Sequence, residues 1–135
     1  MNVGDELGEW AAGGHEAIRS MVKSLNGDLS AFDHDPLTFQ HLLDDFVRRL
    51  PLEELEDDDW VWVHTQLAAY LAEVLIRCRG GHWEKTPEST YVVVVEGPDG
   101  RSRQVDPFKL VDGELRPIPQ RVPRLIERAL SAAGY

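Results

Sequence analysis

The sequence predicts an α+β fold with N-terminal helices, a long central helix, a small antiparallel sheet or hairpin, and a C-terminal helix. Apolar residues recur at helical spacing up to Gly81, and the period then changes to that of strands before helical spacing returns. Helices and strands that are segregated along a chain are typical of α+β folds. A length of 135 residues allows one hydrophobic core but not two, so residues 1–135 are expected to form one globular domain.

The first helix is expected over residues 5–25, where apolar side chains follow helical spacing. Gly13 and Gly14 interrupt this pattern, and two glycines cost about 2 kcal/mol of helix propensity relative to alanine. We therefore expect a weak or bent helix, or two short ones. Residues 26–35 are rich in turn-forming residues and predict a loop.

Two further helices have boundary signals. An aspartate before Pro36 favours a helix start, and Pro51 ends that helix. The central helix is expected over residues 57–79, where the three aspartates 57–59 supply a cap and negative charge at its start and Gly80 closes it. Its apolar face is wide, so we expect other elements to cover it on more than one side.

The strands follow. Residues 82–84 form a candidate short strand, and the β-branched run at residues 90–96 predicts a longer one. Residues 97–100 are expected to turn the chain, and residues 101–105 to return as the hairpin partner. This last segment is polar, so we expect it to be the more exposed strand.

The C-terminal part is expected to hold one more short strand and a helix. The strand is placed at residues 110–111 or 115–116, around a turn at residues 112–113. The helix is expected over residues 119–133, with Pro123 in its first turn.

Charge is distributed unevenly along the chain. The formal net charge is −10, with a net of −11 in residues 1–60 and +1 in residues 61–135. Proteins bind nucleic acid mainly through Lys and Arg, so we expect no nucleic-acid partner. The polarised charge has three interpretations: the two halves pack together, the chain forms a homodimer, or an acidic face meets a basic protein.

The sequence favours a cytoplasmic location. No apolar run approaches the roughly 20 residues of a membrane span, so we expect no membrane association. The first six residues lack the basic and apolar regions of a secretory signal. Because Cys78 is the single cysteine, no internal disulfide can form.

Complete catalytic or metal-binding patterns are absent from the sequence. His41 and Asp45 have a usable two-ligand spacing near His34, but a third ligand would have to come from elsewhere. Cys78 lies on the apolar stripe of the central helix, where burial raises a thiol pKa. We therefore expect no metal and no cofactor, and an interaction protein rather than an enzyme.

An acidic run before and within the start of the central helix is the candidate partner-binding site. It comprises Glu53, Glu54, Glu56, Asp57, Asp58 and Asp59. The run does not match the ligand spacing of an EF-hand. It is interpreted either as a charged helix start or as a surface for a basic protein.

A candidate ligand-binding pocket is centred on Glu73 of the central helix. If Glu73 faces the sheet it must be paired, because a lone buried carboxylate is costly, and Arg77, Arg101 or Arg103 are the expected partners. A structural ion pair is one interpretation and a small pocket is the other. The candidate pocket residues are Tyr70, Glu73, His82, Trp83 and Arg103.

Four segments carry a resemblance to a group of small uncharacterised bacterial domains. A helix of the form Y-L-G-E-V, a G-x-W turn, a hairpin and a D-P-F segment characterise that group. The matching residues are 67–75, 80–83, 92–95 and 106–108, with Ala72 in place of the glycine. Some of these domains resemble immunity or accessory proteins encoded beside toxins or larger enzymes, which implies a binding role but no chemistry.

Together these observations lead to three hypotheses. The first is a non-enzymatic interaction protein of the bacterial cytoplasm, of immunity or accessory type, that binds a basic protein. The alternative is a small-molecule binding domain or minor enzyme with a pocket around Tyr70, Glu73, His82 and Trp83. The third is a homodimer in which the edge strand at residues 101–105 pairs across a two-fold axis.

Overall fold

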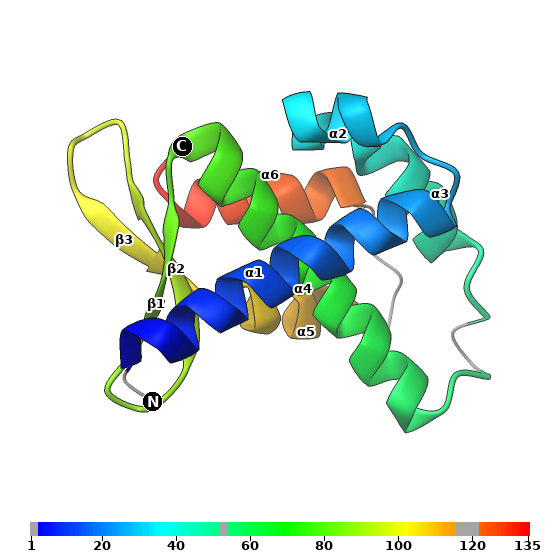
Figure 1. The fold of residues 1–135 in the computed structure, drawn as a ribbon, viewed down its shortest axis with the longest axis horizontal. Helices are drawn as coiled ribbons and strands as arrows, with labels where there is room; N and C mark the ends of the chain where they lie inside the picture. The colour runs from blue at the N-terminus through cyan, green and yellow to red at the C-terminus, as the bar shows by residue number, and fades with distance from the viewer. Residues whose placement is uncertain (1–2, 52–53, 116–121) are drawn as a thin grey trace.

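The longest helix, α4 (Asp57–Arg79), runs through the middle of the structure (Figure 1). The computed structural model describes residues 3–51, 54–115 and 122–135. In this part of the chain the other elements are α1 (Val3–Ser24), α2 (Leu29–His34), the 3₁₀-helix η1 (Pro36–Phe39), α3 (Gln40–Arg48), β1 (His82–Lys85), β2 (Tyr91–Glu96), β3 (Ser102–Val105), α5 (Pro107–Leu115) and α6 (Val122–Ala132). The predicted α+β fold, with its long central helix and small antiparallel sheet, is confirmed.

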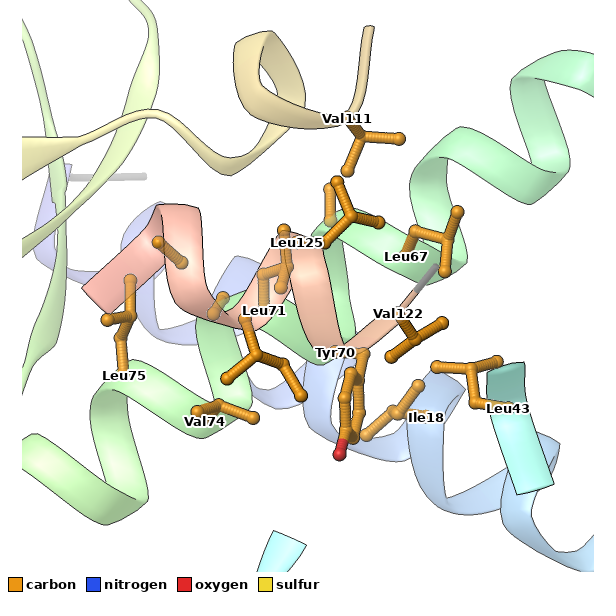
Figure 2. Packing of buried hydrophobic residues seen from close by; sticks show 14 of the residues in the cluster. Ile18, Leu43, Leu67, Tyr70, Leu71, Val74, Leu75, Val111, Val122 and Leu125 are labelled. Carbon is orange, nitrogen blue, oxygen red and sulfur yellow. The ribbon is translucent and has the colours of Figure 1, made fainter. Parts of the chain in front are cut away.

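The core forms around α4 because other elements cover it on several sides. Helix α1 crosses it on the near side in Figure 1, α6 lies behind it, and α5 and β2 also contact it. Leu71, Val74 and Leu75 of α4 are buried in one hydrophobic cluster with Leu125 of α6 (Figure 2). The first turns of α4 extend past α1 and leave the body of the molecule.

The sheet has the strand order β1-β2-β3 and both pairings are antiparallel. His82 pairs with Val94, and Val93 pairs with Val105. β2 is therefore the central strand, which accounts for its β-branched composition. The predicted hairpin is present, and its polar return strand β3 is an edge strand.

Helix α1 is continuous over Val3–Ser24, so the alternative of two short helices is wrong. Tertiary packing outweighs the propensity cost of Gly13 and Gly14, because Ile18 and Val22 are completely buried on the same helix. The predicted loop after α1 also contains structure. Asp28 accepts a hydrogen bond from the Ala31 amide and starts the short helix α2.

The helix predicted after Pro36 begins with a 3₁₀ turn and ends at Arg48, before Pro51. The predicted boundaries of α4 are confirmed, and Gly80 closes it in the left-handed conformation at φ 69°. The cap at its start is different. Glu56 is the N-cap residue and makes no side-chain capping bond, so residues 57–59 contribute charge in the first turn rather than a cap.

The prediction of a short strand at residues 110–111, or of one that includes Leu115, is wrong because residues 107–115 form the helix α5. The side chain of Asp106 accepts hydrogen bonds from the amides of Phe108 and Lys109, and Pro107 stands at the first helical position. Arg116 and residues 119–121 lie outside the described residues, so the described part of the last helix begins at Val122. There, buried Asp44 of α3 accepts a hydrogen bond from the Val122 amide at 2.8 Å.

In the described ranges, none of the helices combines the length and the apolar character that crossing a membrane requires.

Candidate functional site

A hollow of about 300 Å³ lies where α1 crosses α4. Small residues on both helices, among them Gly14 and Ala69, leave room there. The chemically active side chains in its wall are His15, Glu73 and Arg77, and Trp83 of β1 closes one side. We call this space the glutamate hollow.

Glu73 and His15 form an ion pair at this hollow. His15 Nδ1 donates to the carboxylate and lies 3.2 Å from Oε2 and closer to Oε1. The Glu73 side chain is 8% exposed and that of His15 is 42% exposed. Because an unpaired buried carboxylate is costly, this bond explains how Glu73 can face the interior.

The pairing also fixes how His15 can act. With Nδ1 held by a carboxylate, the other ring nitrogen, Nε2, is left to accept or donate a proton. A carboxylate that orients an imidazole is a common device in enzymes, but a reaction also needs a nucleophile or a bound substrate. The described lining of the glutamate hollow includes no serine or cysteine. The arrangement can hold a ligand that carries a hydrogen-bonding or charged group.

An aromatic cluster holds the beginning of α1 against the sheet. Trp10 stacks on Tyr91 with ring centroids 4.0 Å apart, and it meets Trp83 edge-on at 5.6 Å. Glu6 accepts hydrogen bonds from Lys85 and from the Tyr91 hydroxyl, each at 2.9 Å. These contacts keep α1 in place over the hollow.

The structure brings together two of the five predicted pocket residues, Glu73 and Trp83. Tyr70 is completely buried in the core, where its hydroxyl donates to the Pro36 carbonyl at 2.7 Å and burial raises its pKa. His82 is exposed and contacts Glu84. Arg103 binds Asp99 across the hairpin turn. These three side chains lie outside the glutamate hollow.

The partner of Glu73 is a histidine and not one of the three arginines that sequence reasoning considered. Arg77 lies at the hollow but donates to the Phe32 carbonyl at 2.9 Å. His15 was missed because it lies 58 positions from Glu73. One signal was present: His15 follows Ala11 by four residues and precedes Ile18 by three, which places it on the inward side of α1.

The acidic run is on the surface. Glu54, Glu56, Asp57, Asp58 and Asp59 are all exposed, and Glu53 lies outside the described residues. Two large apolar side chains follow directly in the same helix: Val61 is 64% exposed and Trp62 is 49% exposed. Carboxylates and apolar side chains therefore lie together on the part of α4 that extends past α1.

The remaining candidates from the sequence do not form a site. Burial raises the pKa of the Cys78 thiol, as expected, although the side chain is only partly buried. In the part of the chain that the structure describes, no three His, Cys, Asp or Glu side chains gather as metal ligands.

No protein-family model, curated protein or solved structure matches this chain.

Proposed function

We propose that this chain is a non-enzymatic interaction protein of the bacterial cytoplasm, of immunity or accessory type, that binds a basic protein. The supporting observation is the run of five exposed carboxylates before and within the first turn of α4, which the exposed side chains of Val61 and Trp62 follow in the same helix. Carboxylates steer a basic partner toward the surface, and the desolvation of aromatic side chains supplies binding free energy. An acidic surface without exposed aromatic side chains would steer a basic partner but would lack the binding free energy that desolvation supplies.

The test compares two variants of equal net charge as baits in a lysate of the source organism. The first replaces Asp57, Asp58 and Asp59 with asparagine, and the control replaces the exposed residues Glu84, Glu88 and Glu127 with glutamine. Wild type and the control should retain one basic protein in equimolar amount, and the first variant should lose it. Equal retention by both variants would overturn the proposal.

Removal of first-turn carboxylates also weakens α4, by about 0.3–1 kcal/mol for each charge near a helix start. The variant of residues 57–59 must therefore have the helical circular dichroism of wild type at the temperature of the experiment. This control separates loss of a binding surface from loss of structure.

A second candidate function is the binding of a small molecule in the glutamate hollow. Buried Glu73 favours it, because a carboxylate in the wall of a hollow, oriented by His15 and faced by Trp83, can fix a polar ligand among apolar side chains. Native mass spectrometry of the protein from its own host should then show an added mass of a few hundred daltons. Glu73→Gln should abolish that mass, and persistence of the adduct in this variant would exclude the hollow as its site.

A further inference from the structure

We propose that the partner contributes an amphipathic helix with a basic polar face, which lies beside α1 and across the exposed start of α4. This inference rests on the proposed function and specifies its binding surface. The outer layer of the molecule consists here of α1, which passes over α4 at an angle (Figure 1). Next to α1, α4 presents Val61 and Trp62 to solvent.

Two hollows lie on the same flank of α1. The α1–α5 hollow, of about 290 Å³, is bounded by Trp10, Gly13 and Ala17 of α1, Thr65 of α4 and Phe108 of α5. The α1–α3 hollow, of about 320 Å³, is bounded by Ala17, Ser20 and Ser24 of α1, Phe46 of α3, and Trp62 and Gln66 of α4. Ala17 belongs to both hollows, so they adjoin along α1, with Thr65 in the wall of one and Gln66 in that of the other.

The shape of this surface suits a helix. From Trp10 to Ser24, α1 advances about 21 Å at 1.5 Å per residue, the length of a helix of four turns. The α1 flank consists mainly of glycine, alanine and serine, which allow close approach of a second helix. Aromatic side chains stand at both ends, Trp10 with Phe108 at one and Trp62 with Phe46 at the other. An amphipathic helix places apolar anchors at matching intervals.

Gln66 gives independent support for a ligand in the α1–α3 hollow. This residue is 8% exposed and lines the hollow, and its Oε1 atom has no hydrogen-bond partner among the described residues. The oxygen is also shielded from solvent, so a donor that the partner inserts into the hollow would supply the hydrogen bond that this oxygen lacks. Buried polar groups without partners are rare in proteins.

Acidic side chains beside the hollows determine that the polar face of the partner helix is basic. Glu9 lies in the wall of the α1–α5 hollow, and Glu56, Asp57, Asp58 and Asp59 are exposed next to Val61. Lysine and arginine on the partner helix meet these carboxylates while its apolar face covers Trp62.

The test uses a defined probe, a fifteen-residue peptide with leucine on one helical face and lysine on the other, together with a scrambled peptide of the same composition. Amide chemical shifts of the full chain are followed during titration. We expect the amphipathic peptide to bind about tenfold more tightly than the scrambled one, and to shift the amides of Ala17, Ser20, Trp62 and Gln66.

Two variants locate the surface. Ala17→Phe places a large side chain at the position that both hollows share and should weaken binding of the amphipathic peptide about tenfold. Ala12→Phe makes the same change at an exposed position on the opposite side of α1 and should leave binding unchanged.

Three outcomes would overturn the inference. If both peptides bind equally and shift only the amides of residues 54–59, the two hollows along α1 are not the binding site. The acidic surface of the proposed function then stays in place. No binding of either peptide at low salt would contradict both. Formation of a homodimer that Ala17→Phe dissociates, seen by light scattering, would make a second copy of this chain the occupant.

Discussion

Two histidine–glutamate pairs of this chain differ in burial. The carboxylate of Glu73 is buried and paired with His15, whereas Glu84 and its partner His82 are both exposed. A hydrogen bond to a buried carboxylate contributes to the free energy of unfolding, because the carboxylate has little access to water, whereas an exposed pair contributes little. We therefore expect the His15–Glu73 pair to stabilise the fold and the His82–Glu84 pair to contribute little to its stability.

Glu73→Gln tests this difference. The amide keeps the size of the side chain but removes its charge, so the free energy of unfolding should fall by about 1–3 kcal/mol. Glu84→Gln is the matched control and should change it by less than about 0.5 kcal/mol. Urea denaturation at neutral pH measures both, and equal effects of the two substitutions would contradict the burial of Glu73.

Asp99 makes stability depend on pH in acid. Hydrogen bonds from Arg103 and from the Arg101 amide lower the pKa of Asp99 from 3.8 to about 2. A lowered pKa in the folded state means that this stabilisation is complete above pH 3.8 and is lost as the pH falls toward 2. Asp99→Asn should therefore reduce the loss of stability over this range, as measured by urea denaturation at several pH values. An unchanged pH profile would exclude this contribution.

At the scale of elements, the glycines of α1 show a conflict between local preference and packing. A Cβ atom at Gly13 or Gly14 would meet no atom within 4 Å, whereas one at Gly27 would lie 2.9 Å from Val22 Cγ1. Packing therefore does not require the two glycines within α1. They keep open the flank on which we place the partner helix.

Gly13→Ala should raise the free energy of unfolding by about 0.5–1 kcal/mol, because alanine favours the helix and restricts the unfolded chain. Gly27→Ala should lower it, because the new methyl group would crowd Val22. Thermal unfolding monitored by circular dichroism measures both changes. A loss of stability in Gly13→Ala would show that α1 packs more tightly at this point.

Local signals predicted most elements. Pro36, Pro51 and Gly80 mark boundaries through backbone restrictions that act within one or two residues, and the β-branched run of β2 is equally local. Two helices, α2 and α5, were not predicted because a polar side chain could either turn the chain or start a helix. Asp28 and Asp106 look like loop residues in the sequence, and in the structure their carboxylates cap α2 and α5.

Those features of the candidate sites that depend on local sequence were predicted, and those that depend on the packing of separate helices were not. The exposure of Glu56 and its neighbours follows from their charge, and Glu73 stands out as a carboxylate within an apolar helix. The pairing of Glu73 with His15 depends on how α1 crosses α4, which no local pattern encodes. The hollows along α1 likewise arise from the packing of separate helices.

At the scale of the whole molecule, the structure separates a packed core from an uncovered edge. The sheet, α5 and α6 contact α4, and the start of the helix extends past α1 with its carboxylates, Val61 and Trp62 exposed. Exposed apolar side chains that are bordered by carboxylates are the feature on which we base the proposed binding surface.

The most direct test of this account is native mass spectrometry of the protein purified from its own host at moderate salt. We expect a complex in which the 15.3 kDa chain carries one copy of a basic protein, and which dissociates as the salt concentration rises. A mass equal to the bare chain under the same conditions would contradict the interaction function.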